Sequence, residues 1–465
     1  MRPLLKLASL LLASASHAQP ALDTLRALPG TMEGKPIVVS NNPESVSREG
    51  LLLGSDPMTP AVAGTVRRDL SNGTLDSACP AGSMREFAFY MHHLLARPSG
   101  SDAQVERVYV LLEPTGTSAT FNAYGAAISQ ADYIGTQGSL DPGQSPSYSV
   151  SLASLTGTLP AWYSNSTANN GSRFVNLNQQ TISGVFALAN LRGNPGSSLD
   201  ARIKVRATSG CLRVRVVAAS ATNGSVALAN TLSKRAYAWG NVPTTATTVG
   251  GAPCTDANSI GWGRPAGIYQ FERWAGSTAV DITQSTSTIG WRYLAAPPNQ
   301  QLGTTCAMNP QTATPSSNSQ RSNALRYYYT NTSGASEGRD SDPWSTANYG
   351  AEYSLAFRAT NKTGRCVTAR LQVTNYPGGR TCSASTSNMT RHYDGAFTIT
   401  QNGVAQPLQR AFVKCNPADL KPVATIASKV LRASESVDWN IRTFVPGLIS
   451  APAAVLLDSQ PATCP

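Results

Sequence analysis

Short runs in which apolar and polar residues alternate recur along the chain, and they limit the folds open to it. A period of two places successive side chains on opposite faces of a β-strand, with one face toward a core. The runs are followed by Gly, Pro, Asn or Ser, which favour turns. The clearest runs are 107–112, 184–191, 202–217, 352–359, 366–374 and 396–400. The sequence therefore predicts a mainly β fold built from antiparallel β-sandwich-like domains.

One segment interrupts this pattern and divides the chain. Residues 246–322 are rich in Thr, Ser, Gly, Pro and Gln, a composition typical of loops. We expect an N-terminal sandwich over residues 19–245 and a C-terminal sandwich over residues 323–465. An irregular, disulfide-stapled connector joins them. Within the C-terminal part, Asn402-Gly403 predicts a tight hairpin turn.

The first residues have the pattern of an export signal. Arg2 and Lys6 form a short basic region, and an apolar run from Leu7 to Ala13 follows it. Ser16-His17-Ala18 offers small residues at the positions that a signal peptidase reads. The sequence predicts a signal peptide over residues 1–18. The apolar run is too short to span a bilayer as a helix. We expect an exported protein without a transmembrane segment, in the periplasm, on the outer membrane surface or in the S-layer.

The cysteines favour an oxidising compartment. All eight follow the leader, and no two have the C-x-x-C spacing of metal or redox motifs. Many pairings are open to eight cysteines. Pairing of sequence neighbours predicts the disulfides Cys254–Cys306, Cys366–Cys382 and Cys415–Cys464, which leaves Cys79–Cys211.

The charge balance points to acidic partners. The net charge is +11, with 37 basic residues against 26 acids. For an exported chain, the acidic partners are an S-layer or outer-membrane protein, an anionic lipid or an anionic glycan. Nucleic acid is not expected. Only 8 of the 37 basic residues are Lys, so 29 are Arg. The alternative is that genome base composition explains this preference for arginine.

Five cations alternate with apolar residues around a turn at Thr208-Ser-Gly210. They are Arg202, Lys204, Arg206, Arg213 and Arg215. The pattern predicts a β-hairpin with its apolar face inward and its cations outward. Like charges on neighbouring strands repel, so this face needs a compensating group. We predict a partner-binding surface that recognises carboxylate or phosphate groups. The alternative is a solvated face neutralised by carboxylates from other loops.

Three histidines follow the leader, and they are the candidate metal ligands: His92, His93 and His392. Imidazole with methionine and tyrosine nearby favours copper or iron. If residues 86–95 form a strand, His92 and His93 face opposite sides. The chain also lacks the His-x-His pair usual in a copper-only superoxide dismutase. The alternative is a structural role, with His93 buried and hydrogen-bonded and His92 at the surface.

Aromatic residues gather near the start of the expected C-terminal sandwich. They are Tyr327, Tyr328, Tyr329, Trp344, Tyr349 and Tyr353. Exposed aromatic rings beside Asn and Arg suit glycan stacking or a protein interface. The alternative is that they belong to the sandwich core.

Several short segments resemble an uncharacterised family of exported proteins known mainly from cyanobacteria. They are 28–30, 36–44, 49–53, the strand ending at 92–93, 199–206, 348–353 and 393–395. The family carries no agreed activity. The leader and the preference for arginine, with this family, also resemble accessory envelope proteins of Deinococcus. There such proteins associate with the S-layer and its carotenoid-binding complex.

Two functional hypotheses follow from these features. The sequence has no H-E-x-x-H, G-x-G-x-x-G or G-x-x-x-x-G-K motif. The first hypothesis is a non-enzymatic cell-envelope protein that docks onto a partner through its basic surface. The second is an exported copper- or iron-binding protein with superoxide dismutase-like activity.

Overall fold

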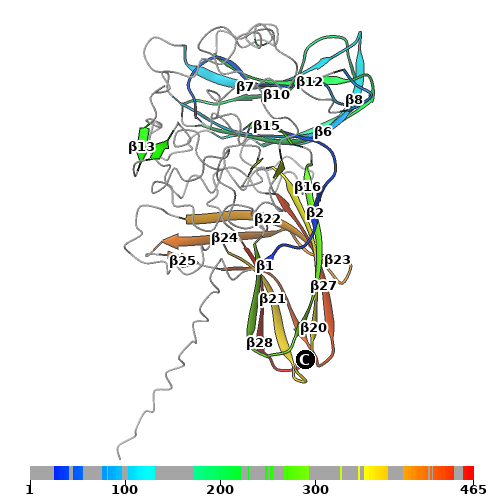
Figure 1. The fold of residues 1–465 in the computed structure, drawn as a ribbon, viewed down its shortest axis with the longest axis vertical. Coiled ribbons are helices and arrows are strands. Elements are labelled where there is room, and N and C mark those ends of the chain that lie inside the picture. The colour runs from blue at the N-terminus through cyan, green and yellow to red at the C-terminus, as the bar shows by residue number, and fades with distance from the viewer. Residues whose placement is uncertain are drawn as a thin grey trace, which may run out of the picture.

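The chain folds into two β-sandwiches, which are stacked along the long axis of the molecule (Figure 1). The computed structural model describes residues 26–40, 45–55, 76–80, 82–96, 103–130, 172–195, 197–220, 229, 247–249, 252–254, 266–269, 271–292, 325–326, 344–345, 350–374, 391–416, 419–421, 423–444 and 454–465. Every named element in these ranges is a strand, which confirms the predicted mainly β, sandwich-like fold. No helix in the described ranges is long and apolar enough to cross a membrane. The predicted signal peptide lies outside these ranges.

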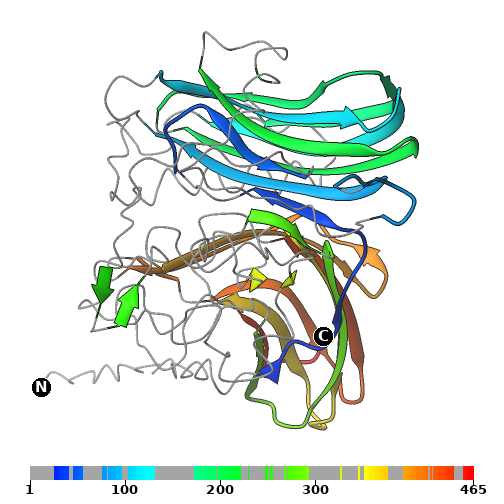
Figure 2. The same ribbon diagram turned by 45° about the horizontal axis from the view of Figure 1, so that its top comes forward.

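The N-terminal sandwich packs a seven-stranded sheet on a four-stranded sheet around one apolar core (Figure 2). The seven-stranded sheet has the order β15 (Ala266–Tyr269), β3 (Ile37–Ser40), β6 (Glu86–Leu95), β11 (Ser198–Ser209), β8 (Ala119–Gln130) and β9 (Ser172–Ile182), with β4 (Ser45–Val46) beside β6. The four-stranded sheet has the order β10 (Phe186–Arg192), β7 (Val105–Pro114), β12 (Leu212–Ser220) and β5 (Gly50–Gly54). Alternate residues such as Phe87, Phe89 and Met91 fill the core, as the period of two predicts.

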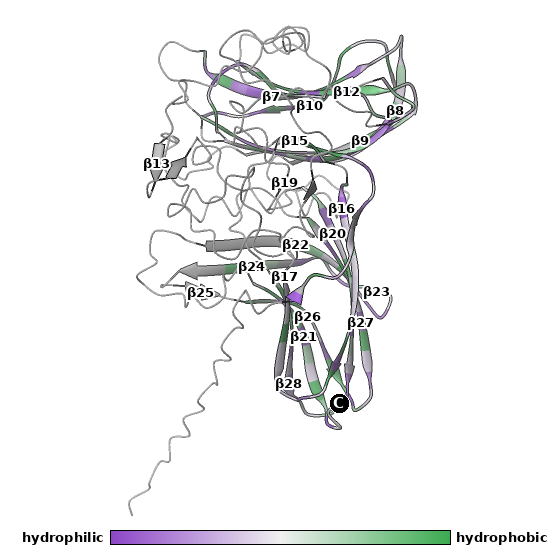
Figure 3. Ribbon diagram, viewed as in Figure 1, coloured by the Kyte–Doolittle hydropathy of each residue, from purple (hydrophilic) through white to green (hydrophobic). Residues whose placement is uncertain are grey.

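The C-terminal sandwich packs an eight-stranded sheet on a five-stranded sheet. The eight-stranded sheet has the order β2 (Thr31–Glu33), β16 (Arg273–Ile282), β20 (Glu352–Asn361), β27 (Ser436–Phe444), β22 (Arg391–Gln401), β24 (Gln409–Asn416) and β25 (Asp419–Lys421), with β23 (Val404–Ala405) beside β22. The five-stranded sheet has the order β1 (Arg26–Ala27), β17 (Ser287–Arg292), β28 (Ala454–Pro461), β21 (Val367–Thr374) and β26 (Ala424–Leu431). Hydrophobic and hydrophilic residues alternate along strands of both sandwiches (Figure 3). Two short strand pairs complete the described elements: β13 (Thr247–Val249) with β14 (Ala252–Cys254), and β18 (Leu325–Arg326) with β19 (Trp344–Ser345).

Part of the segment expected to be an irregular connector is regular sheet. β15 pairs with β3 in the N-terminal sandwich, whereas β16 and β17 belong to the C-terminal one. β16 buries Trp274, Val280 and Ile282, all on one face of the strand. Its Ser, Thr and Gly residues conceal this amphipathic pattern, so composition alone was misleading. β16 also runs parallel to β20, so the sheet is not wholly antiparallel.

The predicted hairpin over residues 202–217 is wrong. β11 pairs with β6 and β8, while β12 pairs with β5 and β7, so the two strands lie in different sheets. Gly210, with φ +71°, lies between them. Val205 and Val214 both belong to the N-terminal core. The chain therefore crosses the sandwich because this buries the apolar faces of both strands against each other.

The Asn402-Gly403 turn is confirmed. It joins β22 to β23, with Gln401 opposite Val404. Asn402 has φ +50° and Gly403 φ +80°. Positive φ at both central residues is the requirement of the type I′ turn, and Asn-Gly meets it at little steric cost.

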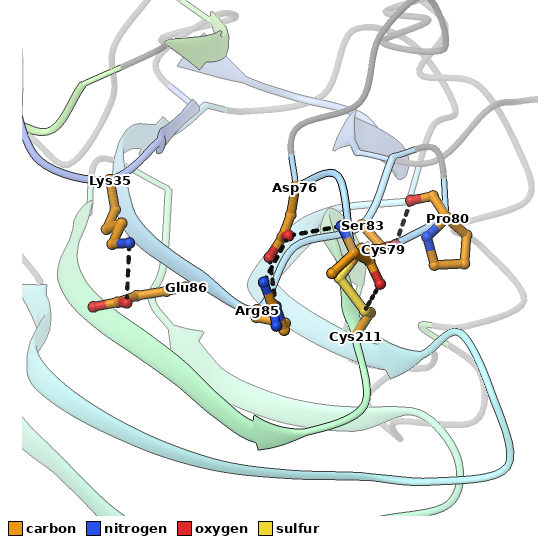
Figure 4. Close-up of polar contacts among 9 residues, drawn as sticks. Lys35, Asp76, Cys79, Pro80, Ser83, Arg85, Glu86 and Cys211 are labelled. Atoms are coloured by element: carbon orange, nitrogen blue, oxygen red, sulfur yellow. Dashed lines mark hydrogen bonds and ion pairs between the residues drawn. A yellow bond between two sulfur atoms is a disulfide. The ribbon is translucent and has the colours of Figure 1, made fainter.

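The disulfide Cys79–Cys211 confirms one predicted pairing (Figure 4). It fastens the turn before β6 to the residue that follows Gly210. Asp76 stabilises the same turn, accepting hydrogen bonds from the Ala78 amide at 3.1 Å and from Arg85 Nε at 2.8 Å. The bond from Arg85 holds the pKa of Asp76 below its ordinary value. The arch between the two sheets is thus covalently anchored.

A second disulfide corrects two predicted pairings. Cys366 bonds to Cys464, with a Cα–Cα distance of 5.3 Å, and not to Cys382; Cys415 therefore does not bond to Cys464. The reason is that β21 and β28 are hydrogen-bonded neighbours, which brings the start of one beside the end of the other. Proximity in the sheet outweighs proximity in sequence. The last predicted pair, Cys254–Cys306, includes a residue outside the described ranges.

Candidate functional site

The outer face of the seven-stranded sheet meets the C-terminal sandwich. Tyr90 of β6 belongs to the same apolar core as Phe444 of β27, and their rings meet edge to face with centroids 6.4 Å apart. Gly350 lies against the Tyr90 ring, where a Cβ atom would come within 2.2 Å of Tyr90 Cγ. We term this region the seam: the outer face of β6, β8 and β11 with Glu272, Glu352 and Arg442. The two sandwiches therefore share core packing.

Glu272 neutralises two cations of β11 at the seam. Its Oε2 atom lies 3.3 Å from Arg202 Nη2 and 3.0 Å from Lys204 Nζ. Arg202 is 0% exposed. Removing one partner of a buried ion pair leaves an uncompensated charge and costs about 3–5 kcal/mol. Arg202 is therefore a structural tie between the two sandwiches.

His92 makes a second buried polar contact on this face. It stands directly opposite Asp200 of β11, with 2.6 Å between His92 Nδ1 and Asp200 Oδ1. His92 was expected at the surface if its role is structural, and this is wrong. Tyr90, two residues earlier on the same face, packs against the C-terminal sandwich, and His92 is itself 0% exposed.

His93 points the other way, into the N-terminal sandwich. Its Nε2 atom lies 2.9 Å from Ser40 Oγ, and the side chain is 0% exposed. A buried, hydrogen-bonded His93 is therefore confirmed. Because His92 and His93 occupy opposite faces of β6, they cannot bind one metal ion together.

The third candidate ligand, His392, lies in β22 opposite Lys414 of β24. Across the ranges that the structure describes, no three His, Cys, Asp or Glu side chains form a group suited to a metal. Among the described residues, the expected copper or iron ligands are therefore not seen to come together. That site stays a prediction from the sequence.

On the C-terminal side of the seam, Arg442 binds Glu352. Arg442 Nη2 donates to both carboxylate oxygens, at 2.8 and 3.1 Å. The Glu352 side chain is 2% exposed, whereas that of Arg442 is 52% exposed. The carboxylate is thus satisfied inside the protein while its guanidinium partner reaches the surface.

The far end of β11 is open to solvent. Arg206 is exposed, and its cross-strand neighbour Glu86 forms an ion pair with Lys35 at 3.5 Å. Within the described part of the chain, Arg206 has no ion-pair partner. Lys204, one step inward on the same face, has a side chain that is 25% exposed. Because no described residue is a counterion for Arg206, its guanidinium is suited to bind an external anion.

Tyr124 of β8 borders the same surface. It stands directly opposite Lys204 and is 46% exposed. Burial of its inner part is the main cause that raises the pKa of Tyr124. The carboxylates of Glu272 and Glu352 raise it further, while the guanidinium groups of Arg202 and Arg442 lower it. Tyr124 therefore lies within electrostatic reach of charges from both sandwiches. We term Tyr124, Lys204 and Arg206 the open patch.

Arg213 and Arg215 lie elsewhere, on the outer face of the four-stranded sheet. Arg215 Nη2 is 2.7 Å from Glu113 Oε2, and Arg215 is 5% exposed. Arg213 stands directly opposite Glu113. The five cations therefore do not form one surface as expected, because the arch places β11 and β12 on opposite sides of the sandwich.

The predicted aromatic cluster is in part core. Tyr353 is 0% exposed, and residues 327–329 and 349 lie outside the described ranges. Sequence reasoning did not single out Tyr124 or Glu272. Tyr124 follows the alternation of residues 119–124, where it faces away from buried Phe121 and Ala123. For Glu272 there was no signal, because it lies in the segment expected to be a connector.

The chain matches no protein-family model and no curated protein. The resemblance to an exported family of cyanobacteria and to Deinococcus envelope proteins therefore stays a prediction.

Proposed function

We propose that the chain is an exported protein of the bacterial cell envelope that docks onto an acidic S-layer or outer-membrane component through the open patch. The carrying observation is that Arg206 is exposed and lacks an ion-pair partner among the described residues. On the same face, Arg202 and Lys204 share the single carboxylate of Glu272. Among the described residues, the cations Lys35, Arg202, Lys204 and Arg206 thus outnumber the carboxylates of Glu86 and Glu272 beside them, and this excess positive charge attracts acidic groups.

The wider structure supports an exported interaction protein. Disulfides persist in oxidising compartments, and both Cys79–Cys211 and Cys366–Cys464 are formed. At the seam, His92 is in contact with Asp200 in a buried position. Such groups tie the fold together, whereas Arg206 of the open patch is exposed and available to a partner.

Charge reversal tests the proposal with a matched control. Arg206 stands opposite Glu86, and Arg213 stands opposite Glu113 on the other sheet. Arg206→Glu and Arg213→Glu therefore place a new carboxylate in the same kind of cross-strand setting. The mature protein is sedimented with S-layer and outer-membrane fragments of the producing bacterium. We expect Arg206→Glu to weaken binding about tenfold, or about 1.4 kcal/mol.

The control decides what a loss of binding means. Arg213→Glu should bind like the wild type, and added salt should weaken wild-type binding, since exposed charges are screened. Equal binding by the wild type and Arg206→Glu contradicts the proposal. An equal loss in both variants also contradicts it, because net charge and not the open patch would then govern binding.

A further inference from the structure

One exposed aromatic side chain, that of Tyr124, lies beside a lysine of the open patch. Among the described residues, the exposed large hydrophobic side chains are Tyr124, Phe271 and Val404, at 46%, 36% and 65%. Tyr124 stands opposite Lys204. Phe271 directly precedes Glu272, whose carboxylate contacts that lysine. An aromatic ring presents a flat apolar face, so this surface can cover an apolar face of a ligand as well as bind its charge.

Cations from both sandwiches lie within electrostatic reach of Tyr124. Lys204 and Arg206 belong to β11 of the N-terminal sandwich, and Arg442 belongs to β27 of the C-terminal one. The Arg442 side chain is 52% exposed, and its charge acts on the Tyr124 hydroxyl. Arg and Lys form charge-assisted hydrogen bonds with carboxylates. The open patch thus combines stacking surface with carboxylate-binding groups.

This combination fits a charged sugar better than a protein surface. A stable protein interface covers about 800 Å² on each partner, centred on several buried apolar anchors. Here the described surface offers one partly exposed ring, that of Tyr124, beside the cations Lys204 and Arg206. A sugar ring has an apolar face of C–H groups that stacks on an aromatic ring, and a uronic acid adds one carboxylate per residue.

We infer that the open patch binds an acidic, carboxylate-bearing polysaccharide of the cell surface. A sugar ring stacks on Tyr124, and its carboxylates bind Lys204 and Arg206. This inference rests on the proposed function, because it names the chemical class of the envelope component that the patch binds.

Titration calorimetry on the purified mature protein tests the inference, with polygalacturonate as the probe. Dextran supplies a neutral polysaccharide, and polyglutamate supplies carboxylates without sugar rings. We expect binding to polygalacturonate and none to dextran. Tyr124→Ala should weaken polygalacturonate binding about tenfold, whereas Tyr124→Phe, which keeps the ring, should change it less than about twofold. Val404→Ala removes exposed apolar surface elsewhere and serves as the matched control with no expected effect.

The outcomes separate this inference from the proposed function. If polygalacturonate does not bind, the inference that the ligand is an acidic polysaccharide is wrong. The same conclusion follows if Tyr124→Ala weakens polyglutamate and polygalacturonate binding equally. If Arg206→Glu still releases the protein from envelope fragments in those cases, the docking proposal stands alone.

Discussion

Arg202 in the middle of β11 and Arg206 toward its end belong to one alternation of cations and apolar residues, yet they have different surroundings. Arg202 is 0% exposed and paired with Glu272, whereas Arg206, four residues on and on the same face, is exposed. The difference arises because the C-terminal sandwich covers only part of the sheet. A basic strand face can therefore be a structural tie at one position and a binding surface at another.

Truncating the two arginines is expected to show the largest difference between these two positions of β11. Arg202→Ala removes one partner of a buried ion pair and should lower the free energy of unfolding by about 3–5 kcal/mol. Arg206→Ala changes an exposed side chain without an ion-pair partner in the described ranges and should change it by about 0.5 kcal/mol or less. Urea unfolding of both variants measures the two values. Similar losses for both would mean that the seam does not end where the structure places it.

Substitution of Tyr124, which stands opposite Lys204 between Arg202 and Arg206, is expected to have a smaller effect on stability. Its folded-state pKa is raised above the ordinary value of 10.0, chiefly by burial. A raised pKa means that the stabilisation is complete below pH 10.0 and is lost as the pH rises through the folded-state value. Tyr124→Phe should therefore reduce the alkaline loss of stability and remove one late step from the phenolate absorbance titration. Loss of an ordinary step near pH 10.0, in place of a late one, would place Tyr124 in a fully solvated setting and contradict the raised pKa.

The sequence predicted the strands well because alternation is a local property. The Asn402-Gly403 turn was also predictable, since its chemistry involves only the residues of the turn. The 202–217 segment was not: the same alternation serves a hairpin or an arch, and only the burial of Val205 and Val214 in one core decides between them. β16 was missed because Ser and Thr dominate a strand that nevertheless buries Trp274.

The candidate site was predicted in part. The cations of β11 were recognised from the sequence. Which of them are neutralised depends on Glu272, which lies some 70 residues from Arg202 in the sequence. The opposite orientation of His92 and His93 followed from strand geometry. That His92 is buried could not be predicted, because it requires knowing that a second sandwich packs against this face. Contacts between distant segments are what local patterns leave out.

Arginine labelling with phenylglyoxal, read by mass spectrometry, tests the division of β11 most directly. The native protein is labelled alone and when bound to envelope fragments. We predict that Arg206 is modified in the free protein and protected when bound, that Arg202 is unmodified in both states, and that Arg213 is modified equally in both. Modification of Arg202 in the free native protein, or equal modification of Arg206 with and without envelope fragments, would contradict the account.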